Sequence, residues 1–181
     1  EAAGWSEILE EARTGDIAFP GGILRMIPTA AMTLFDVDGS GDLASLSIAA
    51  ATAVARAIRR HDIGGSIGVD FPTLPGKSAR QAVAAALDTA LPPPFERTTV
   101  NGFGFLQIVR RRTRASLPEL LRADPAAAEA RALLRMIERT PPPVTARHAA
   151  PARVLARLDA HPEWATALSR RTGVVPIFVL Q

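Results

Sequence analysis

The segment from residue 31 to residue 71 decides the fold, because it contains two short apolar runs that each end in an aspartate. AMTLFDVDG (residues 31–39) reaches Asp36, and RRHDIGGSIGVDF (residues 59–71) reaches Asp70. Both runs have strand character and a long helical stretch joins them, so the segment predicts a β-α-β unit with parallel strands. Open α/β sheets bind ligands at the carboxyl ends of such strands, so we expect both carboxylates at one edge of the sheet.

Two carboxylates at one edge favour a Mg²⁺ site. This ion usually takes one or two protein carboxylates and completes its shell with water and phosphate. The alternative is structural, since an aspartate at the end of a strand can cap the helix that follows it. The spacing of Asp36 and Asp70 alone does not decide between the two interpretations.

The rest of the chain predicts an α/β fold, a mixed sheet with covering helices followed by a small α/β C-terminal domain. Helices are expected at residues 5–14, 43–60 and 78–90, and strands at residues 23–27, 32–37, 66–70, 97–100 and 104–110. Asn101-Gly102 is a strong hairpin signal between the last two strands. After residue 117 the sequence changes to alanine-rich helices (126–139, 151–158 and 163–171) and a final strand at 173–180.

Composition limits the class of protein. The chain is 48% hydrophobic, yet it has no uninterrupted apolar run near the ~18 residues of a membrane span. It contains no cysteine, so disulfides and thiolate metal sites are excluded, which fits a reducing cytoplasm. It opens with an amphipathic, acidic segment unlike a signal peptide and lacks an initiator methionine. We therefore expect a cytoplasmic piece of a longer protein that has no membrane partner.

The basic residues are almost all arginine. Of 21 lysines and arginines only Lys77 is lysine. The arginine fork suits phosphate and can stack on bases, which favours a nucleic-acid partner. The alternative is a GC-rich genome, which raises alanine, arginine, proline and glycine together.

Three segments in order resemble the ribonuclease E/G family. GGILRMIPTAAMTLFDVDG (21–39) resembles the family segment that ends in D-V-N, ARAIRRHDIGGSIGVDF (55–71) resembles the one that ends in D-F, and NGFGFLQIVRRRTRASL (101–117) resembles the one that begins F-G-L. ALLRMIER (132–139) and GVVPIFV (173–179) resemble parts of its small C-terminal domain. The resemblance implies a catalytic, deoxyribonuclease-I-like subdomain at residues 1–122 and the small domain at residues 123–181.

The resemblance implies a Mg²⁺-dependent endoribonuclease that hydrolyses phosphodiester bonds of single-stranded RNA. Asp36 and Asp70 match the family's two metal-binding catalytic aspartates. Asp38 stands where the family usually has a supporting asparagine, so it is a third candidate metal ligand.

The rival interpretation is a non-catalytic RNA-binding or assembly module that retains the fold. We expect the family's RNA-binding and 5′-end-sensing domains to lie upstream of the matched region and outside residues 1–181. A homo-oligomer is compatible with the resemblance, but not one formed through the family's Cys-x-x-Cys zinc link, because the chain has no cysteine.

The resemblance also assigns RNA-binding residues. Arg110 and Arg112 match family arginines that contact the RNA backbone, and Arg97 matches another less closely because the preceding segment is shortened. The alternative for the run around Arg110 is a solvated strand edge. We expect His61 at the surface or in contact with phosphate. Phe103 or Phe105 is expected in the core, and the alternative is a platform on which bases stack.

Overall fold

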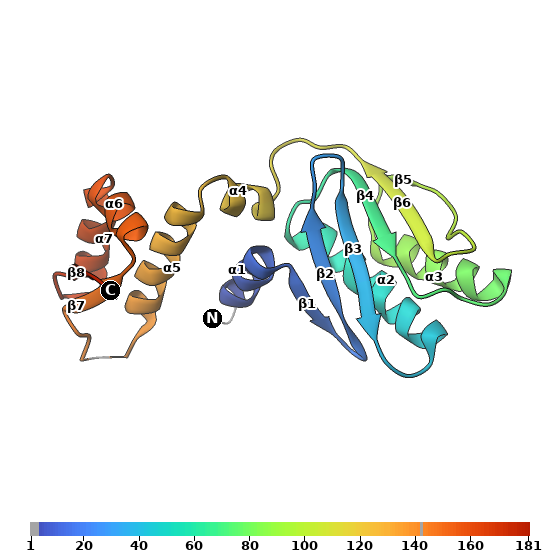
Figure 1. The fold of residues 1–181 in the computed structure, drawn as a ribbon, viewed down its shortest axis with the longest axis horizontal. Helices are drawn as coiled ribbons and strands as arrows, with labels where there is room; N and C mark the ends of the chain where they lie inside the picture. The colour runs from blue at the N-terminus through green and yellow to red at the C-terminus, as the bar shows by residue number, and fades with distance from the viewer. Residues whose placement is uncertain (1–3, 142) are drawn as a thin grey trace. The chain divides into compact units, whose positions relative to one another are not determined.

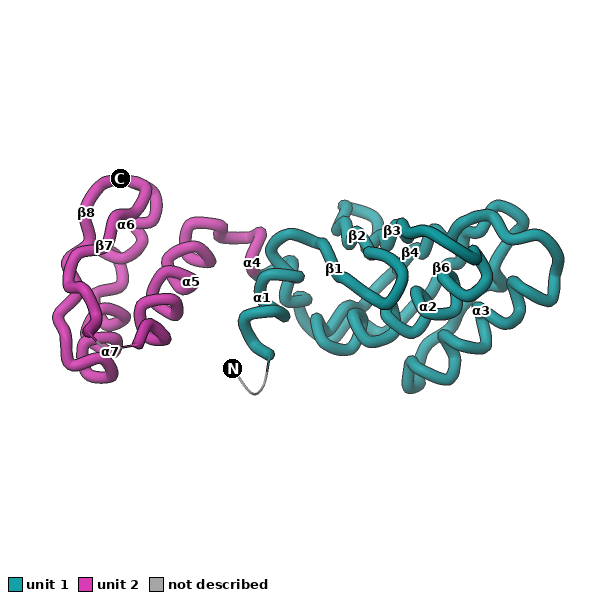
Figure 2. The backbone as a smooth tube through the Cα atoms, turned by 90° about the horizontal axis from the view of Figure 1, so that it is seen from below, with its two compact units in different colours: residues 1–120 teal, residues 121–181 magenta. Residues whose placement is uncertain are grey.

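The structure is a computed structural model that describes residues 4–141 and 143–181. The chain divides into two compact units, residues 1–120 and residues 121–181 (Figure 2). The larger unit contains the predicted β-α-β segment, and the smaller unit contains the alanine-rich helices.

The larger unit is an α/β fold with one mixed sheet and covering helices, which confirms the predicted fold class (Figure 1). Its closer likeness to a deoxyribonuclease-I-like subdomain stays a prediction. The sheet has the order β1-β2-β3-β4-β6-β5, in which β3 and β4 are parallel and the other neighbours are antiparallel. The elements of this unit are α1 (Trp5–Thr14), β1 (Asp16–Phe19), β2 (Gly22–Pro28), β3 (Thr33–Gly39), α2 (Leu43–Arg60), β4 (Gly65–Asp70), α3 (Lys77–Ala90), β5 (Glu96–Arg97) and β6 (Phe105–Arg110).

The parallel pair β3–β4 and the helix α2 between them form the predicted β-α-β unit. Asp42 starts α2, because its Oδ2 accepts a hydrogen bond from Ser45 N at 2.9 Å. Buried residues recur along the helix at one-turn spacing, which fixes the face that packs on the sheet. These residues are Leu46, Ala50, Val54 and Ile58.

Helices α2 and α3 lie on the same face of the sheet, as both views show (Figures 1 and 2). Alternate strand residues face these helices and form the core of the unit. They are Leu24, Met26, Phe35, Val37, Ile67, Val69, Leu106 and Ile108. The residues between them point to the opposite face of the sheet, and no helix of the described larger unit covers that face.

His61 joins the end of α2 to α1 and is fully buried, so its expected place at the surface is wrong. Its Nε2 lies 3.1 Å from Glu11 Oε2, and Arg60 Nη2 also reaches this carboxylate at 2.9 Å. Burial lowers the pKa of His61 to about 4, and the charge of Arg60 acts in the same direction. The neutral imidazole therefore donates from Nε2 to Glu11.

The smaller unit contains α5 (Pro125–Arg139), β7 (Arg147–Ala150), α6 (Ala152–Asp159), α7 (Pro162–Thr172) and β8 (Ile177–Leu180), with β7 and β8 parallel. The helix α4 (Leu117–Ala123) spans the boundary between the units. Ala130, Ala150, Val154 and Leu158 form a small separate core. No helix in the described ranges is both long and apolar enough to cross a membrane.

Candidate functional site

The two aspartates meet on the open face of the sheet. Asp36 and Asp70 are Cα partners in the parallel pair β3–β4. Paired residues on neighbouring strands point to the same face, and such strands lie about 4.8 Å apart. Phe35 and Val69, the residues just before them, are buried under the helices, so both aspartates point away from the helices. The fold thus brings the two predicted carboxylates together where solvent reaches them.

The structural alternative for these aspartates does not hold. Helix α2 is capped by Asp42, and helix α3 has Gly76 at its N-cap position with no side-chain hydrogen bond. Neither Asp36 nor Asp70 caps the helix that follows it. Their position at the paired ends of two strands therefore has no capping explanation.

Asp38 follows on the same face of β3, where Arg25 of β2 contacts it. Arg25 Nη1 lies 2.9 Å from Asp38 Oδ2 and 3.6 Å from Asp36 Oδ2. Within residues 4–141 and 143–181, no group of three or more acidic, histidine or cysteine side chains is arranged to hold a metal ion. Asp38 as a third ligand stays a prediction. Asp36 and Asp70 alone fit Mg²⁺, because this ion needs only one or two carboxylates.

Arg25 is the residue of this site that the sequence analysis missed. It is the Cα partner of Asp36 in the antiparallel pair β2–β3. The strands were expected at residues 23–27 and 32–37, but Arg25 faces Asp36 only because Pro28 lies opposite Thr33, and the sequence did not give this register.

Two loops are joined next to Asp70. Phe71 N donates to Gly104 O at 3.2 Å, and Thr73 Oγ1 donates to Phe103 O at 3.3 Å. Gly104 has φ +97°, and a Cβ there would lie 2.1 Å from Phe71 O, so only glycine fits this crossing. Phe103 is 83% exposed and Phe105 is half-buried, so neither lies in the core as expected. The contact between the loops fixes the end of β4 that carries Asp70.

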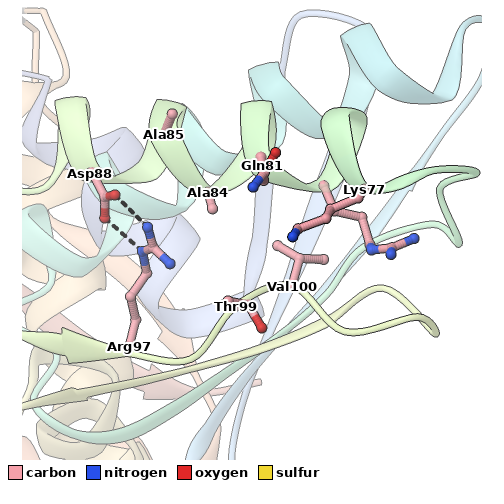
Figure 3. A pocket seen from close by; sticks show the side chains of 9 residues that line it. Lys77, Gln81, Ala84, Ala85, Asp88, Arg97, Thr99 and Val100 are labelled. Atoms are coloured by element: carbon pink, nitrogen blue, oxygen red, sulfur yellow. Dashed lines mark hydrogen bonds and ion pairs between the residues drawn. The ribbon is translucent and has the colours of Figure 1, made fainter.

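Arg97 lies on the other side of the sheet from the aspartates. It is the Cα partner of Ile108, which is buried under the helices, and it pairs with Asp88 of α3. Its Nε lies 2.7 Å from Asp88 Oδ1, and the hydrogen bonds from Arg97 lower the pKa of the Asp88 carboxyl. Figure 3 shows this ion pair at one end of a cavity of about 400 Å³ between α3 and the segment around Thr99, with Lys77 further along it.

Arg110 and Arg112 also have protein partners. Arg110 is two residues after Ile108 on β6, so it points to the same face of the sheet as Ile108. Its Nη1 donates to Ile63 O at 3.4 Å. Arg112 Nη2 lies 3.1 Å from Glu119 Oε1. The structure therefore does not gather the predicted RNA-binding arginines around the two aspartates, and their contact with RNA stays a prediction.

Comparison with known proteins places this chain in a family. The profile of the Ribonuclease E/G family matches residues 2–113, and the chain belongs to this family. Ribonuclease G of Escherichia coli is 32% identical over 113 residues, which cover 56% of this chain and 23% of that protein. Ribonuclease G of Salmonella typhimurium and ribonuclease G of Haemophilus influenzae are each 31% identical over the same length. The match therefore spans less than a quarter of these relatives.

Proposed function

We propose that this chain is the nuclease core of an endoribonuclease, which hydrolyses phosphodiester bonds of single-stranded RNA with Mg²⁺ held by Asp36 and Asp70. The observation that supports this most directly is the pairing of the two aspartates on adjacent parallel strands, on an accessible face, in a member of the ribonuclease E/G family. The relatives that the chain matches are named ribonuclease G.

The proposed chemistry needs a fixed pair of anionic oxygens. When bound, Mg²⁺ would polarise the scissile phosphate and activate water for in-line attack. Asp36 and Asp70 would set the position of the cation relative to the sheet, because hydrogen-bonded strands hold both backbones. The contact between Phe71 N and Gly104 O would keep the end of β4 in place. These residues thus supply the preorganised electrostatics that phosphoryl chemistry depends on.

Cleavage of an unstructured RNA oligonucleotide should require a divalent cation. We expect products with Mg²⁺ and none with EDTA, because two carboxylates without the cation would repel the phosphate. The measurement is a time course of a labelled oligonucleotide on a denaturing gel, with restoration of cleavage by excess Mg²⁺ as the control. Equal cleavage with and without the cation would rule out the proposed mechanism.

A specific observation favours the rival function, a non-catalytic RNA-binding or assembly module. Arg25 Nη1 lies 3.6 Å from Asp36 Oδ2, so the guanidinium of Arg25 already offsets the negative charge of this proposed metal ligand. RNA binding without any cleavage in Mg²⁺ would support this rival.

The proposed RNA contacts of Arg110 and Arg112 can be tested by salt dependence. Replacing both with Gln should weaken binding to every sequence and reduce the slope of log affinity against log salt by up to ~0.7 per lost phosphate contact. The measurement is fluorescence anisotropy with a labelled oligonucleotide in EDTA. The matched control is replacement of Arg170 and Arg171, which lie in the smaller unit. Equal slopes for wild type and the Arg110/Arg112 variant would show that these arginines make no phosphate contact, which is the alternative of a solvated strand edge.

A further inference from the structure

The contact of Arg25 with two aspartates raises the question of how Asp36 could accept a metal ion. A single guanidinium nitrogen, Nη1, serves both carboxylates, at 2.9 Å from Asp38 and 3.6 Å from Asp36. The shorter contact is a hydrogen bond, whereas the longer one is an ion pair beyond hydrogen-bond distance. Asp38 is therefore the main partner of Arg25.

The register places both aspartates within reach of Arg25. Arg25 lies directly across from Asp36 on β3, and Asp38 is two residues further along the same face. On the other side of Arg25, Asp16 of β1 is also a Cα partner. No ion pair between Asp16 and Arg25 occurs in the described part of the chain. The arginine is thus directed along β3 towards Asp38.

The charges of the four side chains Arg25, Asp36, Asp38 and Asp70 match this arrangement. Asp36, Asp38 and Asp70 carry −3 and Arg25 carries +1, which leaves −2. If Arg25 and Asp38 neutralise each other, the remaining −2 belongs to Asp36 and Asp70. That charge balances one divalent cation.

We propose that Asp38 is a positioning residue that holds Arg25 away from Asp36, so that Asp36 is available to the metal ion. This inference rests on the proposed function, because it takes Asp36 and Asp70 as the metal ligands. Asp38 then acts on the site through Arg25, not as a third ligand. Without Asp38, Arg25 has Asp36 as its near anionic partner and competes with the cation.

The test is a double-mutant cycle read by metal binding. Mn²⁺ is titrated into the protein without RNA, and free Mn²⁺ is followed by electron paramagnetic resonance. Asp38→Asn should weaken binding roughly tenfold, because it removes one negative charge and frees Arg25 to pair with Asp36. Arg25→Gln should tighten binding several-fold, since a positive charge leaves the site.

The double variant separates the proposal from simple charge counting. Asp38→Asn should raise the Kd for Mn²⁺ by a smaller factor in the Arg25→Gln background than in the wild type, because no guanidinium remains to move. The two factors should differ at least about threefold. An equal effect of Asp38→Asn in both backgrounds would overturn the proposal and leave Asp38 acting by its charge or as a ligand. Asp16→Asn is the matched control, since Asp16 flanks Arg25 from the other side, and it should change affinity less than twofold.

Failure of this inference can be told from failure of the proposed function. If Asp36→Asn leaves Mn²⁺ binding unchanged, the metal site itself is wrong and this inference falls with it. If Asp36→Asn removes binding but the Arg25 and Asp38 variants do not alter it, only the positioning role is overturned. The side chains of Asp16, Arg25 and Asp38 are exposed and that of Asp36 is half-buried, and circular dichroism verifies that each variant is folded.

Discussion

Replacing Asp36 or Asp70 with Asn should lower the rate of RNA cleavage on the order of a hundredfold to a thousandfold, with the fold intact. Each substitution removes an anionic oxygen but keeps the size of the side chain, and electrostatic groups that act on the reacting phosphate typically contribute this much. Both side chains are outside the core, so the free energy of unfolding should change by no more than about 0.5 kcal/mol. The measurements are single-turnover cleavage and urea unfolding of each variant.

Asp16→Asn is a suitable control for this pair. Asp16 is an exposed carboxylate on β1, on the same open face but two strands away from Asp36. The Asp16→Asn variant should cleave RNA at the wild-type rate. Wild-type cleavage by both the Asp36 and the Asp70 variants would remove the assignment of these residues to the reaction.

Lowering the pH from 6.5 to 4 should destabilise the protein by up to about 3 kcal/mol through His61 alone. The unfolded chain binds a proton on this residue near pH 6.5, whereas the folded protein does so only near pH 4, because the imidazole is buried beside Arg60. The unfolded state therefore binds more protons throughout this window, and stability falls as the pH falls. One pKa unit corresponds to about 1.4 kcal/mol, which sets the size of the effect.

The comparison that isolates His61 uses His61→Gln, which keeps a donor near the position of Nε2 but cannot be protonated. Burial raises the pKa of Glu11, so this carboxyl contributes the opposite slope in an overlapping range in both proteins. Urea unfolding of the two proteins at pH 7, 6, 5 and 4.5 gives the difference. Parallel stability curves would mean that His61 is protonated as easily in the folded protein as in the unfolded one.

The parts of the fold that were predicted from sequence have strong local signals. Helix α2 has the predicted bounds, residues 43–60, because one-turn apolar spacing and the Asp42 cap are both local. Strands β3 and β4 were found because each is a short apolar run between turn residues. The expectation that Asp36 and Asp70 lie at one edge of the sheet followed from the β-α-β connection, which favours parallel strands, whereas their direct pairing comes from the register.

The parts that were missed depend on tertiary contacts. Strand β1 has only four residues and joins β2 through a tight turn at residues 20–21, so its sequence has no clear alternation. The burial of His61 depends on Glu11 of α1, which is far away in sequence. The pairing of Arg97 with Asp88 requires knowing that β5 turns this residue towards α3. In each case the deciding partner lies on another element.

The parallel pairing of β3 with β4 also has a consequence for the order of folding. It is the one parallel pair among the described strands of the larger unit, and the chain must pass through the whole of α2 to close it. Such non-local pairings form later and more slowly than helices and hairpins. A nascent or partly unfolded chain can contain α2 and the β2–β3 hairpin while Asp36 and Asp70 are still apart. The candidate site therefore exists only in molecules that have completed the centre of the sheet.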